Sequence, residues 1–314
     1  MKKKLVAGAV TLLSVVTLAA CANGTNKDIV TMKGDTITVS DFYDEIKTNQ
    51  GAQQVLFQMT INKVFEKEYG SKVSDKEVDK ELAKQKKQLG KQFDAYLAQQ
   101  GLTEETAKKQ IRSNMLLEYA VSQAAKKDIK ESDYKTAFES YTPEVTAQII
   151  KLDSEDKAKE VLEAAKAEGA DFAKIAKDNS TDTATKDKGG EVKFDSGTAD
   201  IPSQVKEAAF KLDENGISDV ITVSAGQNYS ASYYIVKLNK KTEKGSDWKK
   251  YEKRLKEIII EGRKQDTNYI RSIIAKAMTN ANIKVKDDAF KSTFNQYLQN
   301  IGVETSDSSS SSKK

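Results

Sequence analysis

The chain has 314 residues, of which 31% are charged and 38% are hydrophobic, so most of it is expected to be well-solvated protein. Its 51 Lys and Arg nearly balance its 47 Asp and Glu, which excludes a general nucleic-acid binder because such a protein needs a net basic face. The absence of His excludes catalytic triads, His-ligated zinc and imidazole proton transfer. One Cys excludes an intrachain disulfide, and only two Pro favour long helices.

The amino terminus has the pattern of an export signal in residues 1–20. Three lysines at positions 2–4 precede an apolar stretch from Leu5 to Ala20, which is shorter than the ~20 residues of a bilayer span. Small residues then lead directly to Cys21, and this arrangement resembles the lipobox of bacterial lipoproteins. The resemblance implies a diacylglycerol group on Cys21, which would anchor the chain to a membrane. The alternative is an ordinary signal peptide followed by an incidental Cys.

Residues 21–27 are expected to form a short polar tether, and residues 28–142 have the pattern of a hairpin followed by helices. The hairpin is predicted from Ile29–Met32 and Thr36–Val39, with a turn around Gly34. Ser40 is the expected cap of the first helix, which Gly51 can interrupt. Further helices are expected after the capping residues Ser74 and Thr103 and from Lys130–Asp133 onward, and the helix after Ser74 is expected to run to Gly101.

Residues 143–241 follow a different pattern, in which strands enclose helices. Val145–Leu152 and Tyr233–Leu238 have the composition of buried strands. Between them lie a helix around Val161, a second helix capped by Asp171 and a loop containing Gly189 and Gly190. This order predicts a compact α+β domain.

Residues 242–303 return to amphipathic helices, with a short strand expected at Ile283–Val285 and a closing helix around Phe290–Leu298. This segment has too few apolar residues for a core of its own, so it is expected to pack on residues 28–142. The Ser-rich tail, residues 304–314, is expected to be disordered.

Several ordered segments of residues 143–241 carry a family resemblance. Their order and spacing resemble the parvulin family of peptidyl-prolyl isomerases; the segments are Ala147–Ile150, Gly169–Ala176, Asn179–Asp182, Gly189–Gly190, Ala208–Leu212, Gly216–Val220 and Tyr233–Leu238. With the lipobox and the helical flanks, the whole chain is similar to the PrsA foldase lipoproteins of Gram-positive bacteria. The resemblance implies an α+β fold in which the amino- and carboxy-terminal segments form a mostly helical chaperone domain around an inserted parvulin-like α+β domain.

The resemblance also assigns site residues. It places the two family His positions at Gln148 and Tyr234 and the acidic partner at Asp182. The pocket for the proline ring falls on Ile201, Val205 and Phe210. Because both His are replaced and the pocket is reduced, weak or no isomerase activity is expected. Gln148 and Tyr234 can still form hydrogen bonds, so an active isomerase stays open as the alternative, and Asp182 can equally be a turn cap.

The function expected from these observations is an ATP-independent foldase and chaperone for secreted proteins, held at the extracytoplasmic face of the cell membrane by Cys21. Its partners are expected to be unfolded or partly folded secreted chains and the membrane, without nucleic acid, metal or cofactor. A homodimer remains open. A solute-binding lipoprotein is disfavoured, because the chain lacks repeated alternation of strands and helices over two halves.

Overall fold

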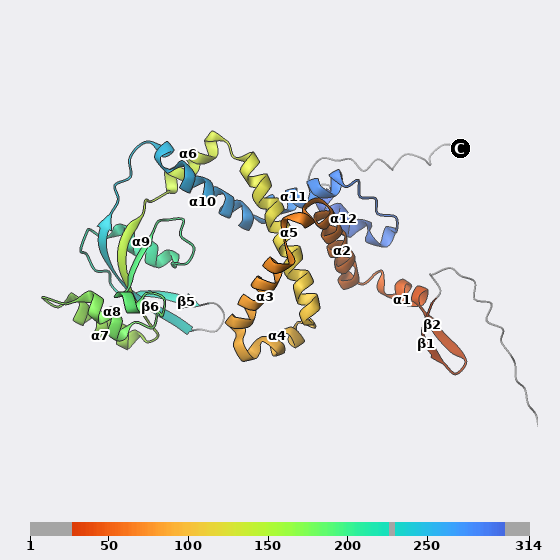
Figure 1. The fold of residues 1–314 in the computed structure, drawn as a ribbon, viewed down its shortest axis with the longest axis horizontal. Coiled ribbons are helices and arrows are strands. Elements are labelled where there is room, and N and C mark those ends of the chain that lie inside the picture. Colours follow the sequence, from red (N-terminus) through yellow and green to blue (C-terminus); the bar gives the residue numbers. More distant parts are fainter. Residues whose placement is uncertain (1–26, 226–229, 299–314) are drawn as a thin grey trace, which may run out of the picture. The chain divides into compact units, whose positions relative to one another are not determined.

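The computed structural model describes residues 27–225 and 230–298 (Figure 1). The chain divides into two compact units, one formed by the residues up to Val64 and those from Ala275 onward, the other by Phe65–Ile274. Helices dominate and the sheets are small, which confirms the predicted fold class. In the part of the chain that the structure describes, no helix has both the length and the apolar character that crossing a bilayer requires. The predicted lipidation site, Cys21, lies outside these residues, as do the signal segment and the Ser-rich tail.

The first unit joins the two ends of the chain around a small aromatic core. Its elements are β1 (Asp28–Met32), β2 (Asp35–Thr38), α1 (Val39–Ile46), the first part of α2 (Gln50–Tyr69), the last part of α11 (Thr267–Asn280), the 3-10 turn η6 (Asp288–Phe290) and α12 (Lys291–Leu298). The Phe57 ring stacks on Tyr297 at 4.2 Å between centroids and meets Phe294 edge-on at 5.4 Å. Gln53 Nε2 donates a hydrogen bond to the Ala289 carbonyl at 2.9 Å. Residues from both termini therefore share one core.

Two local predictions for this unit are wrong. The first helix is capped by Thr38 instead of Ser40, because the Thr38 hydroxyl accepts from the Asp41 amide while the Asp41 carboxylate accepts from the Thr38 amide. The segment Ile283–Val285 is irregular, since no described strand pairs with it and a strand needs a partner for its backbone groups.

The second unit begins with four helices from the amino-terminal half. They are α3 (Asp75–Leu89), α4 (Phe93–Gln99), α5 (Glu104–Asp128) and α6 (Glu131–Ser140). The short 3-10 turn η1 (Gly70–Lys72) precedes α3, and η2 (Gly90–Gln92) lies between α3 and α4. The predicted caps Ser74 and Thr103 are confirmed by their hydrogen bonds. The single helix expected up to Gly101 is wrong: Gly90, with φ of +52°, ends α3 and separates it from α4.

Helix α10 (Glu252–Gln265), which follows a 3-10 turn η5 (Trp248–Tyr251), returns to pack on α5 and α6 in the same unit (Figure 1). Arg263 links the three helices, because it donates hydrogen bonds to the Ala125 carbonyl at 2.9 Å and to the Asp133 carboxylate at 2.8 Å. Lys264 pairs with Glu118 of α5 at 2.6 Å. A helix from the carboxy-terminal segment therefore completes a layer begun by the amino-terminal one.

An α+β module lies between α6 and α10 in the chain. Its elements are β3 (Val145–Leu152), α7 (Glu155–Lys166), α8 (Phe172–Asn179), η3 (Lys186–Lys188), β4 (Glu191–Phe194), α9 (Ser203–Lys211), β5 (Ile221–Ala225) and β6 (Ser230–Lys241). The four strands pair antiparallel in the order β4-β3-β6-β5. Ala147 and Ile149 of β3 face a core that includes α9, whereas Ile150 and Leu152 face a core with α7 and α8. The sheet is therefore buried on both sides, as the strand compositions predict.

Gly190 joins the loop after α8 to β3 at very close range. Its φ is +79°, its carbonyl accepts from the Ile149 amide at 2.8 Å, and a Cβ there would lie 2.5 Å from the Ile149 carbonyl oxygen. We expect Gly190→Ala to lower the free energy of unfolding by about 1–3 kcal/mol from backbone strain, and by more because of the clash, measured by denaturant titration. Gly169→Ala is the control, because Gly169 has φ of +75° but open space around its Cβ position. Equal losses in the two variants would show that the clash contributes nothing.

Candidate functional site

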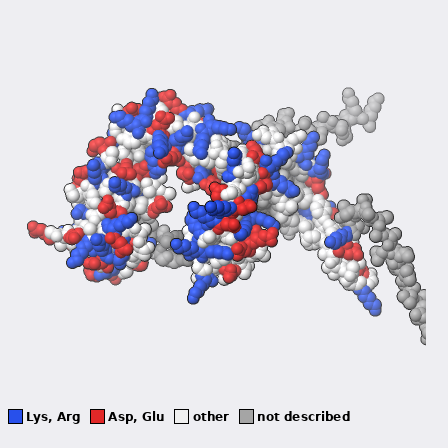
Figure 2. Space-filling view, viewed as in Figure 1, with Lys and Arg blue, Asp and Glu red and all other residues white. Residues whose placement is uncertain are grey.

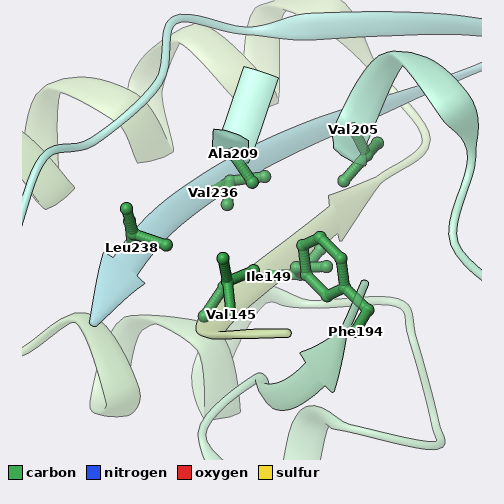
Figure 3. Packing of buried hydrophobic residues seen from close by; sticks show 8 residues of the cluster. Val145, Ile149, Phe194, Val205, Ala209, Val236 and Leu238 are labelled. Carbon is green, nitrogen blue, oxygen red and sulfur yellow. The ribbon is translucent and has the colours of Figure 1, made fainter. Parts of the chain in front are cut away.

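Tyr234 lies on the face of the sheet that packs against α9. It pairs with Lys151 of β3 and with Ile221 of β5, and its side chain packs against the apolar core drawn in Figure 3. Cross-strand partners share one face of a sheet, so the register places Lys151 on the same face. This face therefore carries a phenol and an ammonium group beside an apolar floor.

The three residues assigned to the proline pocket lie in the same cluster as Tyr234. Val205 is fully buried, whereas Ile201 and Phe210 are half-buried at its margin. The Phe210 ring lies 5.8 Å from the Phe194 ring, centroid to centroid. The structure thus brings four of the predicted site residues together, with Val205 contributing packing and no exposed surface.

Gln148 lies on the opposite face of the sheet. It pairs with Lys237 on β6, whereas Tyr234 pairs with Lys151, three positions away along β3. Because side chains alternate between faces along a strand, an odd separation puts Gln148 and Tyr234 on different sides. Gln148 Nε2 instead donates to the Gly189 carbonyl at 3.0 Å. A hydrogen bond between the two side chains, which the sequence left open, is therefore not formed.

Ile149 is another β3 residue on the face of Tyr234, two positions before Lys151. It is 4% exposed and belongs to the same apolar cluster as Val205 and Val236 (Figure 3). Sequence reasoning did not single out Ile149, although counting alternate residues along β3 could have found it. A side chain at this position could join a polar network on this face, but isoleucine supplies no hydrogen-bonding group.

Asp182 caps a turn in the loop between α8 and η3. Its carboxylate accepts hydrogen bonds from the Thr185 hydroxyl at 2.6 Å and from the Ala184 amide at 3.1 Å. These are the local bonds of an Asx turn, so they support the turn-cap interpretation.

A buried carboxylate that the sequence analysis missed fastens the module to α10. Asp195, which is 5% exposed, receives two hydrogen bonds from Arg254, from Nε at 2.6 Å and from Nη2 at 2.8 Å. The Tyr141 hydroxyl and the Thr198 hydroxyl also donate to it, at 3.1 and 3.0 Å. The run from Asp195 to Thr198 is an Asx-turn pattern that could have been recognised, but a partner 59 residues away could not.

The charges of this cluster shift its pKa values. Burial raises the pKa of Asp195, but hydrogen bonds and charge from Arg254 outweigh burial, so that the pKa lies below its ordinary value. Burial, together with the Asp195 charge, raises the pKa of the Tyr141 phenol. The carboxylate is therefore ionised at neutral pH and the phenol is protonated, which suits a structural ion pair better than proton transfer.

A groove of about 390 Å³ lies between α5, α10 and the start of α11. Leu117, Val121 and Ile270 supply its apolar lining, and its polar residues are Asn114, Glu118, Glu261, Lys264 and Gln265. Lys264 is held between Glu118 at 2.6 Å and Glu261 at 2.9 Å. Such a groove can accept an apolar side chain while its rim stays hydrated. In the described ranges, no cluster of carboxylate or thiol side chains is arranged to hold a metal ion.

A family model described as the PPIC-type PPIase domain, or rotamase, matches residues 135–240. Over nearly the full chain, the sequence is 62% identical to the foldase protein PrsA of Streptococcus sanguinis, covering 96% of this chain and 90% of that protein. It is 60% identical to the foldase protein PrsA of Streptococcus gordonii, with both chains covered completely.

Solved structures give the same answer. The crystal structure of foldase protein PrsA from Streptococcus pneumoniae matches with a TM-score of 0.81 and 54% identity, covering 86% of this chain and 99% of that one. Foldase protein PrsA from Lactococcus lactis matches with a TM-score of 0.64 and 39% identity over 86% and 99% of the two chains. The likeness therefore includes the helical flanks as well as the α+β module.

Proposed function

This chain belongs to the PrsA foldase family, and from that premise we propose that it is a lipid-anchored foldase that holds secreted chains while they fold. The family and the PPIC-type domain support a foldase role and make substrate proteins its partners. The finer parts of the proposal are the diacylglycerol on Cys21, a location at the extracytoplasmic face of the membrane, and a module with little isomerase activity.

The observation that carries the holding mechanism is the groove beside α5 and α10. Its lining is apolar at Leu117, Val121 and Ile270, and its rim carries ions that are already paired with one another. A groove of this kind can bind apolar side chains from clients of many sequences, because it offers few unpaired polar groups that would select one particular hydrogen-bonding partner. We propose that it shields apolar side chains of unfolded clients from aggregation.

The reduced catalytic site supports the same mechanism. The face of Tyr234 has isoleucine at position 149, and the fully buried Val205 leaves no exposed surface for a proline ring. Lowering the barrier of an X-Pro bond requires an amide held in a hydrogen-bond network, for which this face offers few groups. We propose that the module serves mainly as part of the scaffold.

The holding function is tested by suppression of aggregation of an unfolded, proline-free client, followed by light scattering. The wild-type chain is expected to suppress scattering. Leu117→Asp is expected to weaken this suppression several-fold, because an apolar side chain that enters the groove would have to displace water from the new carboxylate. Tyr96→Asp is the matched control, since Tyr96 is an exposed aromatic residue of α4 outside the groove. Equal activity of the two variants would remove the groove from the mechanism, and no suppression by wild type would refute holding.

A further inference from the structure

Large apolar side chains are exposed together near the start of the described chain. Seven of them lie on β1, β2 and α1 with exposures between 37% and 53%. One is Tyr43, and we term the other six the hairpin patch: Ile29, Val30, Met32, Ile37, Val39 and Phe42. None of the residues of α1 is buried, and every residue of β1 is exposed. Exposed apolar residues gathered in this way mark a surface that contacts a partner.

The local geometry brings parts of this patch together. Val30 and Ile37 are direct cross-strand partners and so share a face of the hairpin. The Val39 amide donates to the Lys27 carbonyl at 2.8 Å, which fastens the start of α1 beside the start of β1. A two-stranded hairpin is marginally stable in water unless something packs on it. The patch therefore needs a cover.

Helix α1 contacts the rest of its unit through Tyr43. Tyr43 packs on Phe290 with 6.2 Å between ring centroids, and its hydroxyl donates to Asp287 at 2.6 Å. Val39 and Phe42, which lie four and one positions before Tyr43, are 37% and 53% exposed, and Tyr43 itself is 39% exposed. The contacts of Tyr43 thus fix the helix to the unit, while the helix keeps apolar surface that can face a partner.

The distance from the proposed anchor identifies this partner. Asp28 follows Cys21 by only seven residues, so even a fully extended chain places β1 within about 25 Å of the acylated residue. We propose that the hairpin patch lies in the membrane interface beside the diacylglycerol chains. This inference rests on the lipidation of Cys21 in the proposed function, and it adds a second contact to the single covalent one.

The charges of the segment specify the kind of lipid contact. Residues 27–47 contain three Lys, at positions 27, 33 and 47, and five carboxylates, at positions 28, 35, 41, 44 and 45. An excess of negative charge gives no attraction to anionic headgroups. The contact is therefore apolar, and it should persist in zwitterionic vesicles and at high salt.

Hydrogen–deuterium exchange of the lipidated full chain on phosphatidylcholine vesicles tests the proposal. Amides of residues 28–46 are expected to exchange about tenfold more slowly on vesicles than in Cys21→Ala protein in buffer at the same concentration. Adding Ile37→Asp and Phe42→Asp should abolish this slowing while the acyl chains keep the protein bound. Tyr96→Asp, which changes an exposed aromatic residue elsewhere, should leave the slowing intact.

Three results would overturn the proposal. Unchanged exchange in the vesicle-bound chain would show that lipid does not cover the patch. Slow exchange in vesicle-free protein, rising with concentration, would identify a second copy as the cover, and slowing only on addition of an unfolded protein would identify a client. A mass spectrum that shows Cys21 unmodified would instead refute the anchor, and the effect of vesicles on the unmodified chain would then decide the patch separately.

Discussion

Replacing Asp195 with Ala is expected to lower the free energy of unfolding by about 2–4 kcal/mol. The change removes a carboxylate that is 5% exposed and leaves the Arg254 guanidinium without its bidentate partner in a half-buried position. It also removes the acceptor of the Tyr141 and Thr198 hydroxyls. Denaturant unfolding followed by circular dichroism measures the loss.

Asp219→Ala is the matched control for this loss. Asp219 also pairs with a cation, Lys166 at 2.8 Å, but its side chain is 92% exposed. Exposed pairs contribute little, so this variant should lose less than about 1 kcal/mol. Similar losses in the two variants would mean that burial of Asp195 adds nothing to the strength of its ion pair.

The contribution of the same ion pair to the free energy of unfolding depends on pH. Because the folded-state pKa of Asp195 is lowered, its contribution to stability is complete above the ordinary carboxyl pKa of about 3.9 and is lost as pH falls through the folded value. The difference in stability between wild type and Asp195→Ala should therefore shrink below about pH 4, measured by unfolding at a series of pH values.

We expect an X-Pro peptide bound to this chain to isomerise at most about tenfold faster than free peptide, because one hydroxyl hydrogen bond contributes about 0.5–1.5 kcal/mol. Tyr234 offers one such hydroxyl on the face beside the apolar cluster. Tyr234→Phe should remove the remaining acceleration. Protease-coupled turnover of a short peptide measures the rate.

Tyr233→Phe is the control for this experiment, since Tyr233 packs with the α7 and α8 core on the opposite face. Two double variants test the geometry of the sheet. Gln148→His with Tyr234→His should not raise turnover, because these positions lie on opposite faces, whereas Ile149→His with Tyr234→His places both imidazoles on one face. Strong turnover by wild type that survives Tyr234→Phe would establish the active-isomerase alternative.

Local chemistry made much of the fold predictable. Ser74 and Thr103 were identifiable as caps from their own side chains and those of the next turn, and the alternation of buried residues in Val145–Leu152 is enough to predict a central strand. The errors at Ser40 and Gly90 were local, whereas the strand expected at Ile283–Val285 depends on neighbours far along the chain. Nothing local in Ile283–Val285 shows that it lacks a strand partner.

The candidate site was harder to predict for the same reason. The cluster of Tyr234 with Ile201, Val205 and Phe210 agrees with the family resemblance, but assigning Gln148 to the same site depended on a register that differs by one residue. A shift of one residue exchanges the two faces of a strand. The groove beside Leu117 depends on the packing of α10, which residues close in sequence do not specify.

The position of the module between α6 and α10 also sets the order in which the chain can mature. All four strands are present once Lys241 has been synthesised, so the sheet can close over a continuous stretch. Arg263, by contrast, must find Ala125, which precedes it by 138 residues. A nascent chain that emerges amino end first can therefore complete this sheet before α10 is available to pack on α5. The groove proposed to shield client chains is then among the last parts of the protein to form.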